Sequence, residues 1–258
     1  MSLFDRIAWI CLAALLATGS VAEAQIKIEP NTGFDPQEAA TRGRALVGEL
    51  LNRKPEPSDR TNILRIESAD GKRREVKVRF QTLVTPTNWV AIYEVVPGQR
   101  SRMTLAVTSQ VGKPNIYHFS NAAPAVLSGD QTMVPFAGSD FWAADLGLEF
   151  LHWPQQKVIK QEMRKSQACD VLESTNPNPS AMGYTKVVSW IDSDSGGIVH
   201  ADAYDSSGKI LKRFEPSEIQ RVDGRMQVKE IRMSNRKTGS RSWVVFDLTA
   251  DANAPAAK

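Results

Sequence analysis

Ser195 is the side chain whose surroundings most suggest catalysis, because it lies in the run Asp194-Ser195-Gly196-Gly197. A serine attacks a carbonyl carbon efficiently only when a positioned histidine takes its proton and a carboxylate orients that histidine. No histidine of this chain stands in a motif that would supply such a partner. Because strand-like segments flank the run on both sides, a β-hairpin turn explains it more simply than a nucleophile does.

The three histidines, His118, His152 and His200, are isolated from one another in the sequence. A zinc site needs three or four ligands, and none of these histidines has a second ligand at the spacing of a helix or finger motif. Asp140 and Asp145 do not suggest an acid–base pair, because we expect Asp140 to cap a helix and Asp145 to lie on its surface or anchor a loop. No glycine-rich phosphate loop follows a strand. We therefore expect no metal, no cofactor and no enzymatic activity.

Residues 136–146, near the middle of the chain, combine a bend with a short aromatic helix. Gly138 permits the bend, and Ser139 or Asp140 can then cap the helix. Such a helix either packs in the core against a sheet or forms a lid over a lipid-sized cavity, and the residues alone favour the core helix. Its bulky apolar side chains are Phe141, Trp142 and Leu146.

A longer, amphipathic helix is predicted from Asp35 to about Asn52, ahead of Pro55. Asp35 can act as its N-cap and Pro36 suits its first turn. Glu38 can complete a capping box by reaching back to the start of the helix. One helix therefore precedes the strands that follow.

Hydrophobic and polar side chains alternate after this helix, which predicts antiparallel strands joined by tight turns. The clearest case is the segment 74–84, where Val78 and Phe80 alternate with Lys77 and Arg79. One face of this strand should therefore be buried and the other exposed to water. The same alternation places Trp89, Tyr93, Met103 and Leu105 on the apolar faces of the next two strands.

About ten or eleven strands are expected in all, with residues 210–214 and 219–222 counted as two of them. A sheet of this length twists too strongly to stay flat, so it should curl around a concave apolar face. The helices must fill that face, alone or together with a ligand. The predicted fold class is mainly β (α+β): a strongly curved antiparallel sheet with an N-terminal helix and a helical insertion in mid-chain.

Residues 1–24 have the features of a signal peptide. Arg6 precedes an apolar run over residues 7–16, and Ala22-Glu23-Ala24 provides small residues at the two positions that a signal peptidase reads. The run is too short to span a bilayer as a helix. We expect cleavage near Ala24/Gln25 and export to the periplasm, with a retained N-terminal anchor as the alternative.

Residues 25–249 are expected to form one domain, and residues 250–258 a disordered tail of Ala, Asn, Asp and Pro. The net charge of the chain is only +3, and no dense Lys/Arg block is interleaved with aromatic residues, so nucleic-acid binding is not indicated. Cys169 is the only cysteine left after cleavage, so no internal disulfide can form, and we interpret it as a small buried hydrophobe.

Several stretches, mostly in the second half of the chain, agree in residue type and order with one protein family. They are Gly138-Ser139-Asp140-Phe141 followed by Asp145-Leu146, Cys169-Asp170-Val171-Leu172-Glu173, the segment 184–192, Tyr204-Asp205 and the segment 208–212. Together they resemble the GSDF…DL signature and the following strands of the outer-membrane lipoprotein-sorting protein family, relatives of the periplasmic carrier LolA. The first half agrees only in the order of its elements.

This resemblance implies an unclosed β-barrel with a helical lid that holds the acyl chains of lipoproteins or other lipids. It implies a monomeric periplasmic carrier in outer-membrane lipoprotein sorting, with an inner-membrane donor protein and an outer-membrane acceptor protein as partners. The residues that would form the hydrophobic cavity and its lid are Val78, Phe80, Trp89, Tyr93, Met103, Leu105, Phe141, Trp142 and Leu146.

Two other functions stay open on the sequence. The same fold could serve as an envelope-stress sensor or regulatory binding module that signals through a partner protein. Alternatively, the chain could be a hydrolase whose catalytic residues carry no recognisable motif. Lipid that co-purifies with the protein would separate a carrier from a hydrolase, and a stable complex with an inner-membrane regulator would favour the sensor.

Overall fold

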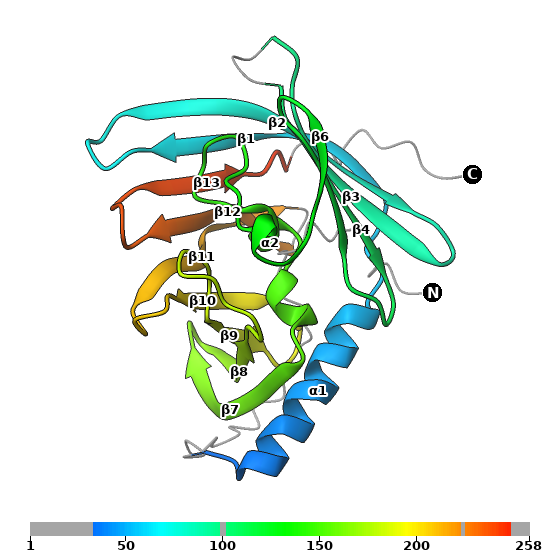
Figure 1. Ribbon diagram of the computed structural model, residues 1–258, viewed down its shortest axis with the longest axis vertical. Helices are drawn as coiled ribbons and strands as arrows, with labels where there is room; N and C mark the ends of the chain where they lie inside the picture. Colours follow the sequence, from blue (N-terminus) through cyan, green and yellow to red (C-terminus); the bar gives the residue numbers. More distant parts are fainter. Residues whose placement is uncertain (1–32, 99–101, 223–224, 249–258) are drawn as a thin grey trace.

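Thirteen antiparallel strands form one continuous curved sheet in the computed structural model, which describes residues 33–98, 102–222 and 225–248. Their order across the sheet is β6-β5-β4-β3-β2-β1-β13-β12-β11-β10-β9-β8-β7, so β1 and β13 pair in its middle (Figure 1). The strands are β1 (Ser58–Glu67), β2 (Arg73–Val84), β3 (Asn88–Val95), β4 (Thr104–Gln110), β5 (Ile116–Ser120), β6 (Pro124–Leu127), β7 (Gln155–Arg164), β8 (Gln167–Thr175), β9 (Lys186–Asp192), β10 (Ile198–Tyr204), β11 (Ile210–Val222), β12 (Arg225–Asn235) and β13 (Arg241–Val245).

The two edges of the sheet, β6 and β7, are joined by residues 128–154, which we call the crossing segment. Because it connects opposite edges, it runs across the concave face, where Figure 1 shows α2 in front of the sheet. Its short helices are η1 (Gly129–Thr132), α2 (Ala143–Leu146) and η2 (Glu149–His152). The sheet is therefore unclosed, and the chain itself spans the opening.

The N-terminal helix, α1 (Pro36–Asn52), begins as predicted. The carboxylate of Asp35 accepts hydrogen bonds from the backbone N–H groups of Gln37 (2.9 Å) and Glu38 (3.2 Å). The predicted capping box does not form, because the Glu38 carboxylate pairs with Arg42 one turn later (2.9 Å). The cap alone therefore satisfies the first N–H groups of the helix.

The helix α1 lies directly on the edge strand β7. A Cβ atom on Gly43 would come within 2.5 Å of the backbone of Gln156, so only glycine allows this close approach. Val47 and Leu50, further along the helix, are buried in the main core. In Figure 1 the helix extends from β7 toward β3 and β4.

The sheet has more strands than the ten or eleven that were predicted. The pattern misses β6, which begins at Pro124, because its side chains are mostly exposed and do not alternate. In the opposite direction, residues 210–214 and 219–222, which were counted as two strands, belong to a single strand, β11, with Pro216 inside it. Proline is tolerated there because β10 pairs with β11 only as far as Phe214, so the missing N–H interrupts no central ladder.

The alternation that predicts the first strands is confirmed. In β2, Val78 and Phe80 are buried and Lys77 and Arg79 are exposed. The main hydrophobic core lies between this inner face of the sheet, the crossing segment and α1. The fold is therefore mainly β, as expected, with its apolar face turned toward the crossing segment.

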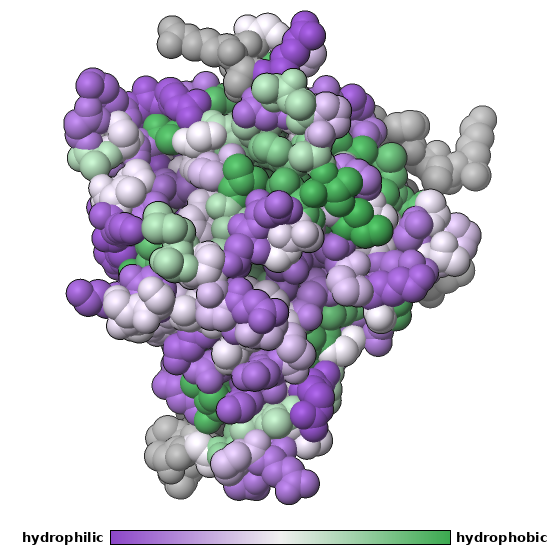
Figure 2. Space-filling view, viewed as in Figure 1, coloured by the Kyte–Doolittle hydropathy of each residue, from purple (hydrophilic) through white to green (hydrophobic). Residues whose placement is uncertain are grey.

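The face shown in Figure 2 is mostly polar, with hydrophobic residues gathered over the part of the sheet formed by β3, β4 and β6. Among the large hydrophobic residues, Ile116 on β5 and Val126 on β6 have exposed fractions of 50% and 61%. The edge strand β6 is short and begins with Pro124, which limits its pairing with a strand of another chain.

The predicted signal peptide, residues 1–24, and the predicted tail, residues 250–258, lie outside the described residues. Within the part of the chain that the structure describes, no helix is both long and apolar enough to cross a membrane. The described residues of the segment 25–249 share one main hydrophobic core.

Candidate functional site

Gly138 bends the crossing segment as predicted, with a φ of 65° next to a φ of 51° at Ala137. Glycine adopts this left-handed conformation freely, whereas alanine rarely does. The Ser139 hydroxyl stabilises the bend by accepting a hydrogen bond from the N–H of Phe141 (3.2 Å). Arg74 on β2 donates to the carbonyl oxygens of Ala137 (2.8 Å) and Gly138 (3.0 Å), so the bend is attached to the sheet.

Asp140 does not cap the short helix, contrary to the prediction. Its carboxylate accepts hydrogen bonds from the hydroxyls of Ser240 (2.6 Å) and Ser242 (2.8 Å), and its N–H donates to Ser242 Oγ (2.9 Å). Ser242 lies on β13, so these bonds attach the crossing segment to the middle of the sheet. The start of α2 is capped by Asp145, whose carboxylate accepts from the N–H of Trp142 (2.7 Å).

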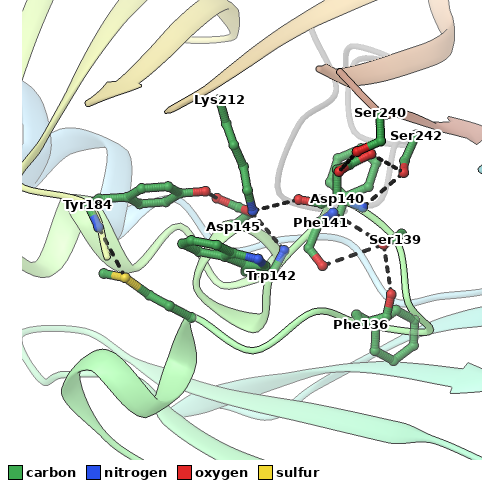
Figure 3. A network of polar contacts seen from close by, with 11 residues as sticks. Phe136, Ser139, Asp140, Phe141, Trp142, Asp145, Tyr184, Lys212, Ser240 and Ser242 are labelled. Atoms are coloured by element: carbon green, nitrogen blue, oxygen red, sulfur yellow. Dashed lines mark hydrogen bonds and ion pairs between the residues drawn. The ribbon is translucent and has the colours of Figure 1, made fainter. Parts of the chain in front are cut away.

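Lys212, on β11, is buried beneath the crossing segment, although lysine is almost never fully buried unless it is paired. Its Nζ donates to the carbonyl oxygen of Asp140 (2.7 Å) and lies 3.4 Å from Asp145 Oδ2 (Figure 3). It also lies 3.3 Å from the centre of the Trp142 ring, in a cation–π contact. Burial lowers the pKa of Lys212 to about 8, while the charges of Asp145 and Asp140 oppose that change.

Tyr184 completes this cluster from the segment just before β9. Its hydroxyl donates to Asp145 Oδ1 (2.8 Å), and its ring stacks on Trp142 with 4.8 Å between centroids and 20° between planes (Figure 3). Burial, together with the neighbouring Asp145 carboxylate, raises the pKa of Tyr184 well above its usual range. Asp145 thus links α2 to Lys212 on β11 and to Tyr184 in the segment before β9.

A second set of hydrogen bonds attaches the crossing segment to the other half of the sheet. Asn115 Nδ2 donates to the carbonyl oxygen of Gly147 (2.8 Å), and the Tyr117 hydroxyl donates to Glu149 Oε2 (2.8 Å). Burial raises the pKa of Glu149, whereas the bond from Tyr117 opposes that change. The crossing segment is therefore held by polar bonds to both halves of the sheet.

Beneath the crossing segment lies an apolar space of about 60 Å³, which we call the inner cavity. The only charged residues on its wall are Asp145 and Lys212, within the described residues. An apolar cavity of ~150 Å³ in a protein core is large enough to admit benzene. In this conformation the inner cavity is therefore too small for an acyl chain, and a chain could enter only if the crossing segment moved.

Four of the nine residues predicted for the cavity and lid line the inner cavity. Phe80 and Tyr93 come from the sheet, and Phe141 and Leu146 come from the crossing segment. The Tyr93 hydroxyl donates to the carbonyl oxygen of Leu146 (3.0 Å), so its polar end is satisfied within an apolar wall. The mid-chain helix is thus part of the core and part of the cavity roof at once.

The other five predicted residues lie elsewhere. Val78 and Leu105 are buried in the core without lining the inner cavity. The sulfur of Met103 accepts a backbone N–H of the crossing segment (3.0 Å). Trp142 lies beside Lys212 in the polar cluster, and Trp89 lines a second cavity. Alternation identifies the inner face of a strand, but it does not locate a residue along that face.

Most of the strand residues on the inner cavity wall come from β9 to β13, and none of these residues was predicted to belong to the site. In β9 and β10 nearly every side chain is buried, so no alternation marks the inward face. In β12, Ile231 and Met233 alternate with Arg232, and this signal could have identified the wall. The principal wall residues from these strands are Val187, Ile198, Ala201, Phe214, Ile231 and Val244, and Phe246 follows directly after β13.

The second cavity, which we call the outer cavity, has a volume of about 330 Å³. It lies between the end of α1, the turn 110–115, η2 and the turn between β9 and β10. Leu148 and Ile198 line both cavities, so the two spaces are adjacent. Its wall carries the basic side chains of Arg53 and Lys113.

Ser195 lies in the hairpin turn between β9 and β10, as predicted, and Gly196 and Gly197 of the same turn line the outer cavity. The Asp192 carboxylate accepts hydrogen bonds from the Ser195 N–H (3.1 Å) and hydroxyl, and Gly196 adopts a φ of 71°. Arg53 donates to the Ser195 carbonyl oxygen (2.6 Å), which ties the turn to the end of α1. These contacts are those of a structured turn.

The three histidines occupy different environments. His118 is exposed on β5, and His200 is buried with Nε2 3.2 Å from Asp202 Oδ1. His152 is half-buried on the wall of the outer cavity, and burial lowers its pKa. Across the described ranges, no three His, Cys, Asp or Glu side chains come together as a metal site. Cys169 is buried, which raises its pKa to about 11.

The sequence matches one family model, over residues 97–254, and that family is described as "Uncharacterized protein". No curated protein matches the chain. Similar solved structures therefore provide the most informative comparison.

Three solved structures share the fold. A DUF1329 family protein from Desulfovibrio piger is 17% identical, with a TM-score of 0.66 over 82% of this chain and 92% of that protein. A proposed outer membrane lipoprotein-sorting protein domain from Vibrio parahaemolyticus is 18% identical, with a TM-score of 0.65 over 80% of this chain and 90% of that protein. A LolA superfamily protein from Nitrosomonas europaea is 19% identical, with a TM-score of 0.53 over 84% of this chain and 97% of that protein. At identities this low, the structural similarity establishes a common fold and nothing more.

Proposed function

The chain belongs to a family of uncharacterized proteins and has the fold of the LolA superfamily, and from this premise we propose that it is a periplasmic lipid carrier. It would hold an acyl chain of a lipoprotein or another lipid in the inner cavity and take part in outer-membrane lipoprotein sorting. The supporting observation is a continuous apolar wall beneath a segment that joins both edges of the sheet.

Exclusion of water would drive binding. Each acyl methylene that leaves water for an apolar site contributes ~0.8 kcal/mol, so a chain of ordinary length binds tightly if it is enclosed. The inner cavity of about 60 Å³ does not enclose such a chain in this conformation. Loading therefore requires the crossing segment to move away from the concave face while the sheet, held by its ladders, stays intact.

The polar bonds around the crossing segment suit this movement. When the segment lifts, the hydrogen bonds among Lys212, Asp145 and Tyr184 break, and each side chain forms hydrogen bonds to water instead. The free energy lost with the first set of bonds is therefore largely offset. The closed position excludes water, and the open position exposes apolar walls that an acyl chain can cover. Ligand binding and segment position are then linked, because each changes the apolar area left exposed.

Binding of fluorescent fatty acids with increasing chain length tests this function. An enclosed chain strengthens binding by ~0.8 kcal/mol for each added methylene, which is about fourfold in Kd, until the cavity is full. Affinity that does not depend on chain length would contradict enclosure. The variant Ala201→Leu adds carbon atoms inside the inner cavity and should shorten the longest chain accepted.

The matched control is Ala106→Leu on β4, which makes the same change at a half-buried position that does not line the inner cavity. It should leave the dependence on chain length unchanged. Thermal melts of both variants establish that any loss of binding by Ala201→Leu occurs in a folded protein.

A further inference from the structure

The inner and outer cavities are separated by a wall to which Leu148 and Ile198 contribute, since both residues line both spaces. The outer cavity, at about 330 Å³, is the larger of the two, whereas the inner cavity measures about 60 Å³. Ile198 is fixed in the β10 ladder opposite Ile191. Leu148 belongs to the crossing segment, so its side chain moves if that segment moves.

The backbone at Leu148 is held in an unusual conformation. Its φ is 48° and its ψ is 45°, a left-handed geometry that is unfavourable for leucine and free for glycine. It stands between α2 and η2, directly after Gly147. A Cβ atom on Gly147 would lie 2.3 Å from the Tyr117 hydroxyl, so the connection between α2 and η2 packs closely against β5. Strain of this kind often marks functional positions, and here it lies at the wall between two cavities.

The wall of the outer cavity combines apolar and basic side chains. Leu51 and Trp89 provide apolar surface, while Arg53 and Lys113 provide positive charge. No Asp or Glu contributes to this wall among the described residues. Arg53 is already engaged with Glu49 and the turn at Ser195, whereas Lys113 is exposed in the turn between β4 and β5. A cavity of this composition favours a ligand with an acyl chain and an anionic head group.

We propose that the outer cavity binds the anionic head group, a carboxylate or phosphate, of a single-chain amphiphile whose acyl chain passes Leu148 into the inner cavity. This inference rests on the proposed carrier function and adds the class of ligand and its route. Lys113 contacts the head group, and Leu148 controls access between the cavities. The basic rim orients the ligand, and the apolar walls supply most of its affinity.

Competition binding with three probes of equal chain length tests the head-group assignment: a fatty acid, the corresponding fatty alcohol and a lysophosphatidic acid. The wild type should bind an anionic probe about threefold more tightly than the alcohol, the size expected for a partly exposed charge pair. Lys113→Gln should remove most of that preference while leaving affinity for the alcohol unchanged. Lys237→Gln, in the turn between β12 and β13, is the matched control and should retain it.

The outcomes separate the two proposals. Preference for the acid identifies a carboxylate head group, and preference for the lysophosphatidic acid identifies a phosphate. Equal binding of all three probes, or a preference that survives in Lys113→Gln, overturns the head-group assignment and leaves the carrier function standing. Failure of all three probes to bind overturns the carrier function and this inference together.

Stopped-flow uptake of the fatty acid tests the gate. Leu148→Gly removes both the side chain and the strain, so uptake should be faster. Leu148→Trp enlarges the barrier and should slow uptake by about tenfold. The control Leu83→Trp, at an exposed position on β2, should match the wild type. Unchanged uptake by Leu148→Gly, with a cooperative melt, would overturn the route past Leu148 even if Leu148→Trp failed to fold.

Discussion

Lys212 Nζ lies 2.7 Å from the carbonyl oxygen of Asp140, so a buried cation on β11 holds a bend that lies 72 residues earlier in the chain. The same ammonium lies 3.4 Å from Asp145 at the start of α2. A buried ammonium is costly unless it is paired, so this arrangement ties the position of the crossing segment to the charge of one lysine. The contact joins the cavity roof to the half of the sheet that supplies most of the strand residues on the cavity wall.

Replacing Lys212 with methionine should destabilise the protein by about 3 kcal/mol at pH 7, because removal of one partner leaves Asp145 without its cation. Urea unfolding curves of Lys212→Met, Asp145→Asn and the double variant measure this effect. The two residues are in direct contact, so the double variant should lose less stability than the sum of the single changes. Additive losses would show that the ion pair does not contribute.

Stability should also depend on pH through Lys212. Its pKa is lowered from 10.5 to about 8 in the folded protein, so the unfolded chain binds more protons between these values. The free energy of unfolding therefore rises with pH in this window. Between pH 7 and pH 9.5 the difference between wild type and Lys212→Met should grow by at most about 2 kcal/mol. A difference that stays flat or shrinks would contradict the lowered pKa of Lys212.

The two faces of β2 should respond differently to truncation. Phe80→Ala should cost ~3 kcal/mol or more, because it removes buried surface and enlarges the inner cavity. Lys77→Ala, three residues earlier on the exposed face, should change stability by no more than about 0.5 kcal/mol. Chemical denaturation of both variants gives the comparison, and equal losses would mean that the face assignment is wrong.

A disulfide between the crossing segment and β13 should prevent loading. The buried side chains of Asp140 and Ser242 are in hydrogen-bond contact (2.8 Å), so cysteines are introduced at both positions, and intact mass spectrometry establishes that oxidation has joined them. The oxidised double variant should not take up a fluorescent fatty acid, and a reductant should restore uptake. The two single variants control for the lost hydrogen bonds. Undiminished uptake by the crosslinked protein would show that loading needs no movement at this point.

Local sequence features predict much of this fold. The cap at Asp35, the bend at Gly138 and the alternation around Phe80 each depend on neighbouring residues, and each is present in the structure. Strand number is less predictable, because Pro216 marks a break in the sequence but lies in a section of β11 with one neighbour. Whether a proline interrupts a ladder depends on a partner strand that local pattern does not specify.

The site is less predictable because its contacts join distant parts of the chain. Asp140 has the residue type of a helix cap, yet its partners Ser240 and Ser242 lie about a hundred residues later. Burial of Lys212 has no local signal, since it follows from the path of the crossing segment over β11. A short helix follows the bend as predicted, but it covers only Ala143–Leu146, so Phe141 and Trp142 precede it instead of lying on its surface. The partners of this segment in the cavity wall come from strands without a clear pattern.

Native mass spectrometry of the protein purified from a periplasm, followed by extraction and identification of any bound lipid, tests the carrier function most directly. The proposed function predicts a population heavier than the polypeptide by the mass of an acyl lipid, which is lost on denaturation. Ala201→Leu should reduce that population, and Ala106→Leu should not. A protein that carries no lipid, and that binds no fatty acid when one is offered, would contradict the proposal.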